Sequence, residues 1–381
     1  MGHMPQGGMR RPTAAAAVLL LLLLLLCIGA HAVEQDACLP SEAHPSAGCA
    51  AANLAASVGG GSRAAPQAGA AGGSSQQTGR ICEYQDEVHA EGMEGIEIGE
   101  HGYKYRIVDG LMVPPYVTPT RYNASRTVVT RPTDVCYCSF PKSGSTWLAT
   151  VLYLLLNDGV EPEGRPLRSN LHWMESSWTY PRTQAEVDAL PSPRIFKSHM
   201  PHRMALAGGP RNSPCKHIYI ARNPKDVAVS YYHFESGKAW SGRYNGTWEH
   251  WLRIFTEGRV QRGDWFEHVL SWWEQRDAPN LLFLKYEDLK SDFRGQLRRI
   301  AAYLQVQLSA EAEERIVSAT TFAHMRAAGF SNHKHIADFE GFFRKGEIGS
   351  WKDRFTMAQS EAFDKLCRQR MAGSGLEFDF E

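Results

Sequence analysis

Four short apolar runs, each ending in a polar or aromatic residue, restrict the fold of this 381-residue chain more than any other feature. Three of them, residues 134–140, 217–222 and 280–286, are followed by apolar residues at helical spacing, and the fourth, residues 194–199, lies between prolines. Strands that alternate with helices form a parallel sheet covered by helices on both faces. The sequence therefore predicts a single α/β domain with a central parallel β-sheet flanked by helices.

The ends of these predicted strands indicate where a ligand binds, because open parallel sheets bind ligands at the carboxyl ends of their strands. The residues at these ends are Lys142 to Thr146, His199, Arg222 and Tyr286. The first group forms a polar turn between a strand and a helix. The first N–H groups of a helix lack partners and carry the positive end of its dipole, so this turn predicts an anion site.

The turn resembles a P-loop but differs from it in order. A Walker turn has its lysine after the last glycine, whereas Lys142 precedes Gly144. Gly144 allows close approach of the backbone to an anion, and Ser145 and Thr146 supply hydroxyl groups. No apolar run ends in an obvious metal-binding aspartate. A nucleotide kinase or hydrolase is therefore the weaker interpretation.

Five segments, in order, resemble the motifs of the cytosolic-type sulfotransferases, which use 3′-phosphoadenylyl sulfate (PAPS) as sulfuryl donor. They are FPKSGSTW (140–147), FKSHMP (196–201), ARNPKDVAVSYYHF (221–234), TTFAHM (320–325) and RKGEIGSWKDRFT (344–356). The resemblance covers residues 101–381 and implies the P-loop-NTPase-like sulfotransferase fold. It says nothing about the segment that precedes them.

The resemblance also implies a set of PAPS-binding residues in three groups. The expected contacts are Lys142, Ser143, Gly144, Ser145, Thr146 and Trp147 for the 5′-phosphosulfate, with Trp147 near the adenine; Arg222, Ser230, Arg344, Lys345 and Gly346 for the 3′-phosphate; and Tyr286, Thr320, Phe322 and Met325 along the nucleotide. This set is chemically coherent, since a second phosphate needs arginines that make paired hydrogen bonds and a purine needs aromatic faces.

The expected reaction transfers the sulfuryl group of PAPS to a hydroxyl or amine of a small molecule and releases 3′-phosphoadenosine 5′-phosphate. His199 is the expected general base, because imidazole titrates near neutral pH. Lys142 is expected to stabilise the leaving oxygen, and Lys197 the transferring group. The resemblance implies that Ser230 engages Lys142 before the acceptor binds. No metal is expected, since His199 and His202 have no cysteine or carboxylate ligand nearby in the sequence.

Other interpretations stay open at this point. One is a lumenal sulfotransferase that acts on glycans or protein tyrosines, and another is a catalytically inactive PAPS-binding module. Glu287 and Asp288, which follow Tyr286, are interpreted as a structural corner rather than an acid–base pair. Residues 352–361 resemble the dimer segment of the family, with Met357 where valine is usual, and predict a homodimer.

Residues 1–100, about the first quarter of the chain, differ in composition from the rest. An apolar run over residues 14–30 follows Arg10 and Arg11, so residues 1–33 predict a cleaved signal peptide or a retained membrane anchor. Residues 34–100, rich in Ala, Gly and Ser, predict a flexible spacer before the domain at 101–381. The expected location is the secretory pathway, with the cytoplasm or another organelle as the alternative. The chain carries 41 basic and 41 acidic side chains, so a nucleic-acid partner is not expected.

Overall fold

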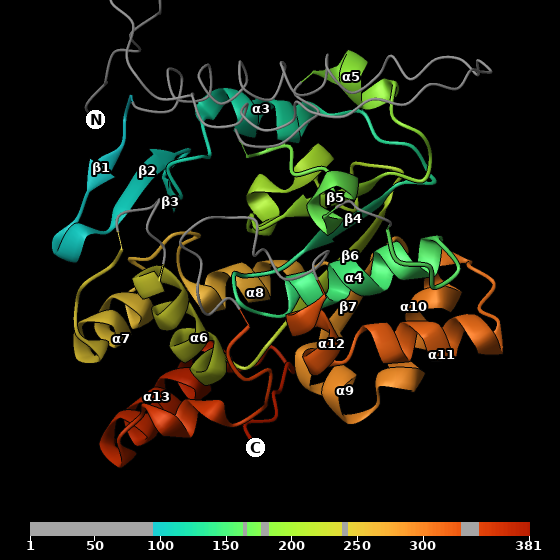
Figure 1. The fold of residues 1–381 in the computed structure, drawn as a ribbon. Coiled ribbons are helices and arrows are strands. Elements are labelled where there is room, and N and C mark those ends of the chain that lie inside the picture. The colour runs from blue at the N-terminus through green and yellow to red at the C-terminus, as the bar shows by residue number, and fades with distance from the viewer. Residues whose placement is uncertain (1–93, 163–165, 177–182, 238–242, 329–342) are drawn as a thin grey trace, which may run out of the picture. The chain divides into compact units, whose positions relative to one another are not determined.

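The computed structural model describes residues 94–162, 166–176, 183–237, 243–328 and 343–381 (Figure 1). Residues 1–33 and most of the 34–100 spacer lie outside the described residues, so the signal peptide or anchor and the flexible spacer stay predictions. None of the helices in these ranges is both long and apolar enough to cross a membrane.

Parallel strands form the central sheet of the described domain in the order β5-β4-β6-β7 (Figure 1). They are β4 (Val135–Cys138), β5 (Ile195–Ser198), β6 (Lys216–Ala221) and β7 (Leu281–Lys285). Each overlaps one of the four apolar runs of the sequence, so the predicted parallel sheet is confirmed. In the observed register Cys138 pairs with Ser198, and Ala221 pairs with Lys285, which aligns the carboxyl ends of the strands.

Helices cover both faces of this sheet because successive strand residues point to opposite sides. On β6, Ile218 and Ile220 belong to one buried cluster, whereas Tyr219 and Ala221 belong to the other. The first cluster includes side chains of α4 (Ser145–Leu156), α10 (Phe293–Leu304) and α11 (Ala310–Ala319). The second includes side chains of α6 (Pro224–Gly237), α7 (Trp248–Thr256), α8 (Trp265–Trp273) and α13 (Met357–Arg370).

Side chains at the N-caps explain where several of these helices begin. At the start of α13, Thr356 and Gln359 form a capping box, in which each side chain accepts a hydrogen bond from the backbone of the other. Helix α4 differs, because its N-cap is Gly144, which offers no side chain. The first N–H groups of α4 are therefore left for a partner from outside the helix.

An antiparallel meander precedes the central sheet and was not predicted from the sequence. It consists of β1 (Glu97–Ile98), β2 (Lys104–Val108) and β3 (Leu111–Val113). Asp109 and Gly110 join β2 to β3 with φ angles of 49° and 71°. Asp-Gly is the typical pair for such a two-residue hairpin turn, so a sequence signal for this turn was present. The described residues also form α3 (Pro119–Thr127), α5 (Gln184–Asp188), α9 (Tyr286–Ser291) and α12 (Phe322–Ala327).

Candidate functional site

The strand ends bring the predicted site residues together at one edge of the sheet. The pairing of β4 with β5 places His199 beside Ser139, whose carbonyl oxygen lies 2.8 Å from Nδ1 of His199. The pairing of β6 with β7 places Arg222 beside Tyr286, with the guanidinium carbon 4.4 Å from the centre of the Tyr286 ring. His199, Arg222 and Tyr286 each follow the last residue of a strand, at the carboxyl edge of the sheet.

Gly144 shapes the turn between β4 and α4. Its φ of 98° is unfavourable for residues with a side chain, and an added Cβ would lie 2.8 Å from Cδ2 of Tyr286. The N–H of Leu148 makes the first helical hydrogen bond, to the carbonyl of Gly144 at 3.0 Å. The N–H groups of Ser145 and Thr146 come before that bond, at the positive end of the helix. This geometry suits an oxyanion.

Two side chains of the turn add to this anion site. Ser143 is fully buried, and its hydroxyl has no hydrogen-bond partner among the residues that the structure describes. A buried unpaired hydroxyl is costly, and an anionic oxygen would satisfy it. Lys142 has a φ of 69°, and its Nζ lies 4.4 Å from the centre of the Phe234 ring. Ser230 lies one helical turn before Phe234, so Lys142 extends over the face of α6 that carries Ser230.

Two arginines form a second basic group at the same edge. Arg222 donates from Nη2 to the carbonyl oxygen of Glu347 at 2.6 Å, and Arg344 donates from Nη2 to Oγ of Ser350 at 2.7 Å. The Nε atoms of both arginines are buried and lack a hydrogen-bond partner within the described ranges. Guanidinium nitrogens bind phosphate well, so these donors suit a second anionic group. Lys345 is paired with Asp353 at 2.6 Å.

Asp226 holds this second basic group in place, and sequence reasoning missed it. Its carboxylate is fully buried and accepts hydrogen bonds from the N–H groups of Gly349 at 3.0 Å and Trp351 at 2.9 Å. It also accepts from Oγ of Ser350 at 3.1 Å and lies 3.3 Å from Nη2 of Arg222. The sequence carries no clear signal for this role, because an aspartate in the first turn of a helix also suits the helix dipole on an exposed helix.

We expect Asp226→Asn to weaken binding of a nucleotide with a 3′-phosphate by about tenfold or more, which corresponds to about 1.4 kcal/mol. In the native protein, N–H and O–H donors face both carboxylate oxygens of Asp226. The amide of the variant replaces one of these oxygens with an NH2 group, which cannot accept, so the 344–351 segment is held less firmly. Isothermal titration measures the change, with the exposed Asp158→Asn variant as the control. Unchanged affinity in a folded Asp226→Asn protein would contradict this positioning role.

Aromatic side chains flank the anion sites. Trp147 stacks on Phe293 with ring centres 5.4 Å apart, and its Nε1 is buried without a partner in the described part of the chain. Gly346 has a φ of 69°, and an added Cβ would lie 2.3 Å from Cδ2 of Phe322. Phe322 therefore lies against the 344–346 segment, as a residue of a shared site should. Met325 is buried, and the Thr320 hydroxyl donates to the carbonyl of Ile316 at 2.7 Å.

The tautomer of His199 follows from its partner. A carbonyl oxygen only accepts, so Nδ1 donates to Ser139 and Nε2 keeps its lone pair. The residue is 7% exposed, and burial lowers its pKa well below the usual value, with the positive charges of Lys197 and Arg262 acting in the same direction. His199 is therefore a neutral imidazole at physiological pH, with one nitrogen able to take a proton.

A buried ion pair contacts the backbone of His199, and sequence reasoning missed it. Glu175 accepts from the N–H of His199 at 2.9 Å, and it lies 3.5 Å from Nη1 of Arg262. Both side chains are buried. Nζ of Lys197 lies 4.0 Å from the centre of the Trp173 ring, and burial lowers the pKa of this lysine to about 8. The backbone just after β5 is thus held by a carboxylate that also pairs with Arg262.

Glu287 occupies a structural corner, as interpreted from the sequence. Its Oε1 accepts from the backbone N–H of Asn223 at 2.8 Å and from the side-chain amide of the same residue at 3.1 Å. Burial raises the pKa of the Glu287 carboxyl to about 7. Asp288 pairs with Lys285 at 3.3 Å. These contacts join the end of β7 to the start of α6 rather than to a reacting group.

Comparison with known proteins gives consistent matches over this domain. A family profile described as "Sulfotransferase domain" matches residues 132–375. Mouse sulfotransferase 1B1 is 41% identical over 258 residues, which cover 65% of this chain and 85% of the relative. Human sulfotransferase 1C2 is 34% identical over 295 residues, covering 73% of this chain and 96% of the relative. The crystal structure of mouse sulfotransferase SULT7A1 complexed with PAP is similar, with 30% identity and a TM-score of 0.60, and the match covers 70% of this chain and 93% of that one.

Proposed function

The chain belongs to the sulfotransferase family, and we propose that it transfers the sulfuryl group of PAPS to a hydroxyl or amine of a small molecule. The observation that carries the proposal is the set of buried donors without a hydrogen-bond partner in the described part of the chain, on Ser143 and Arg222 at strand ends and on Arg344 in the segment that contacts Arg222. They form two groups, as the two separate anionic ends of PAPS require. A related mouse enzyme has been solved with PAP, which supports the same ligand class here.

The proposed roles of the residues follow from charge and position. The turn over residues 142–147 holds the 5′-phosphosulfate, and Arg222 with the 344–346 segment holds the 3′-phosphate. Holding the donor in line with the acceptor contributes much of the catalysis, as in phosphoryl transfer. Ser230 is proposed to engage Lys142 until the acceptor binds, which restrains hydrolysis of PAPS.

The chemical step breaks the bond between sulfur and the bridging oxygen of PAPS and forms a bond from sulfur to the acceptor. The acceptor proton passes to Nε2 of His199, and the electron pair of the broken bond stays on 3′-phosphoadenosine 5′-phosphate. Lys142 neutralises the charge that develops on the leaving oxygen, and Lys197 supports the transferring group.

Location and assembly are separate proposals. A signal peptide or anchor over residues 1–33 would take the enzyme into the secretory pathway, where its acceptor would also have to be present. Residues 352–361 are proposed as a homodimer contact. They include the start of α13, where Met357 is 82% exposed.

We expect the purified chain to transfer radiolabelled sulfate from PAPS to at least one compound in a panel of phenols, steroids, alcohols and amines. The rate is expected to be the same with EDTA, because no step of the proposed reaction uses a metal, whereas nucleoside triphosphate hydrolysis depends on Mg²⁺. A matched set of glycans and tyrosine peptides tests the other acceptor class. Transfer to the latter set alone would overturn the small-molecule assignment.

A further inference from the structure

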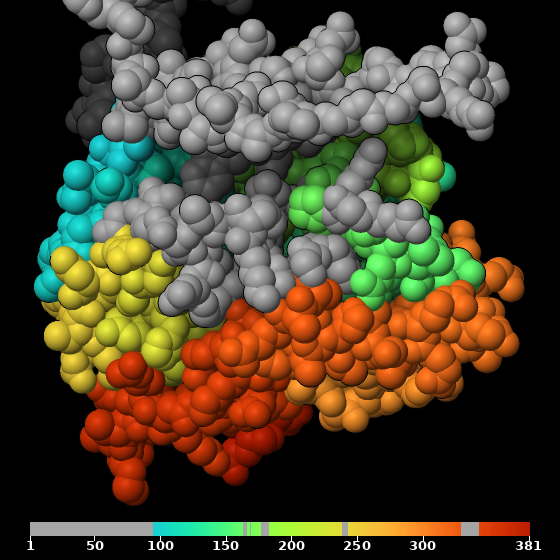
Figure 2. Space-filling model, in the orientation of Figure 1, coloured from blue at the N-terminus to red at the C-terminus, as the bar shows by residue number. Residues whose placement is uncertain are grey.

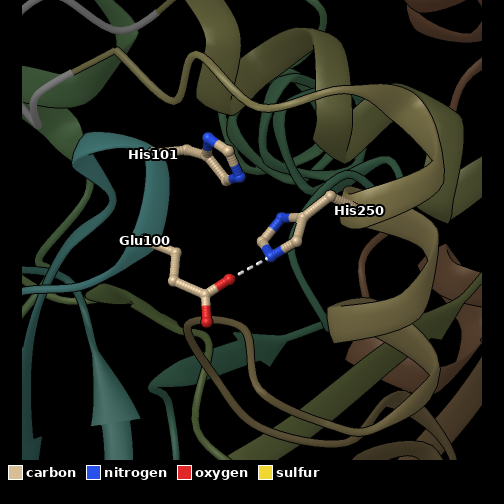
Figure 3. A group of neighbouring side chains, drawn as sticks. All are labelled: Glu100, His101 and His250. Carbon is tan, nitrogen blue, oxygen red and sulfur yellow. Dashed lines mark hydrogen bonds and ion pairs between the residues drawn. The ribbon is translucent and has the colours of Figure 1, made fainter.

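A group of potential metal ligands lies outside the nucleotide site, where the N-terminal meander meets α7. It consists of Glu100, His101 and His250, and one ligand atom from each lies within 4.8 Å of the other two (Figure 3). Glu100 and His101 belong to the short turn after β1, and His250 is in the first turn of α7. Figure 2 shows the cyan N-terminal strands directly against the yellow surface of α7. The cluster therefore joins two segments that are far apart in sequence.

We propose that Glu100, His101 and His250 bind a divalent transition metal, with Zn²⁺ as the best fit. Two imidazole nitrogens and one carboxylate oxygen form a known zinc donor set, and they leave the fourth tetrahedral position for water. Zinc takes these ligands at about 2.0–2.2 Å. Glu100 is exposed, and its carboxylate lies beside the imidazole of His250 (Figure 3), so it can move aside to admit an ion.

Contacts outside the cluster hold the two histidines in position. The carbonyl oxygen of His101 accepts a hydrogen bond from the N–H of Asn245 at 3.0 Å. The N–H of His250 donates to Oγ1 of Thr247, the N-cap of α7, at 3.3 Å. The two imidazole rings lie edge to face with centres 4.4 Å apart. The metal would therefore meet ligands that are already close.

His250 also has a hydrogen-bond partner on its second ring nitrogen, as metal-bound histidines usually do. Its Nε2 lies 2.5 Å from Oε2 of Glu100, and its Nδ1 lies 2.6 Å from the hydroxyl of Tyr244. A metal on Nε2 would replace the proton shared with Glu100. The metal-bound imidazole then carries its one proton on Nδ1, and this N–H donates a hydrogen bond to the Tyr244 oxygen. The Tyr244 hydroxyl can turn toward the carbonyl of Thr247, 3.5 Å away.

A simple ion pair is the competing explanation, and the chain contains a matched example of one. His324 lies 2.6 Å from Glu161, and no metal-ligand group containing this pair was found among the described residues. Arg253 lies 3.7 Å from Oε2 of Glu100, so its charge opposes a bound cation. The proposal therefore predicts moderate affinity that increases when this charge is removed.

The test is calorimetric titration of Zn²⁺ into the full chain after treatment with EDTA and removal of the chelator. We expect a binding event that His101→Ala weakens at least tenfold, that Arg253→Gln strengthens, and that His324→Gln leaves unchanged. His101 is exposed, so its substitution should not unfold the protein, and a thermal melt without metal checks this. Absence of Zn²⁺ binding, or equal losses in His101→Ala and His324→Gln, would overturn the proposal.

Discussion

The His199→Ala variant is expected to lose between about 100-fold and 10,000-fold in kcat, the range that a general base contributes. Its affinity for 3′-phosphoadenosine 5′-phosphate should stay close to that of the unmodified chain. The loss in kcat is expected because Nδ1 donates to the Ser139 carbonyl, which leaves Nε2 as the nitrogen that can take the acceptor proton. Steady-state kinetics with saturating PAPS, combined with calorimetry of nucleotide binding, separates the two quantities.

The pH profile gives a second measurement of the same role. A base works in its neutral form, and burial holds the pKa of His199 below the ordinary imidazole value of about 6.5. Activity should therefore persist as the pH falls through that value and decline only at lower pH.

His202→Ala is the control for the His199→Ala variant, because the His202 ring lies against Trp272, with ring centres 5.4 Å apart. Unchanged turnover in a folded His199→Ala enzyme would refute the assignment of the base.

The second large effect is expected for Arg222→Ala. Removing charge-assisted hydrogen bonds worth about 1.5–3 kcal/mol weakens binding of 3′-phosphoadenosine 5′-phosphate by roughly 10-fold to 150-fold. Adenosine 5′-phosphosulfate lacks the 3′-phosphate, so its affinity should change little. Competition for PAPS turnover, or direct calorimetry, gives both values on the same protein preparation.

Arg222→Lys refines this test, because lysine keeps the charge but loses the planar fork that binds two oxygens at once. It should fall between the unmodified chain and Arg222→Ala for the 3′-phosphorylated nucleotide. A surface control is Arg315→Ala, which removes an exposed pair with Asp158. If both nucleotides lost affinity equally in Arg222→Ala, the residue would be acting on the fold and not on the 3′-phosphate.

The parallel sheet and its strand ends could be predicted because their signals are local. Each buried strand is a continuous apolar run, and the residue after it is the one placed at the edge where ligands bind. Once four strands are parallel, His199 and Arg222 must lie near the 142–147 turn. The strand order β5-β4-β6-β7 could not be predicted, because nothing in the sequence of a strand such as β5 indicates which strand pairs with it.

The supporting residues could not be predicted in the same way because their partners are distant in sequence. Glu175 meets Arg262, and Asp226 meets Gly349, only after the strands and helices have packed. Each looks like an ordinary surface residue when read alone. The turn at Asp109 and Gly110 is different, since its signal is local and was overlooked.

The strand ends are proposed to bind an adenylate with negative charge at both its 3′ and 5′ positions. Calorimetric titration of the full chain with 3′-phosphoadenosine 5′-phosphate, and in parallel with adenosine 5′-monophosphate, tests it most directly. We expect one binding event for the first nucleotide and affinity weaker by at least about tenfold for the second, since one set of charge-assisted hydrogen bonds is missing. A folded protein that gives no heat with the first nucleotide, or binds both equally, would contradict it.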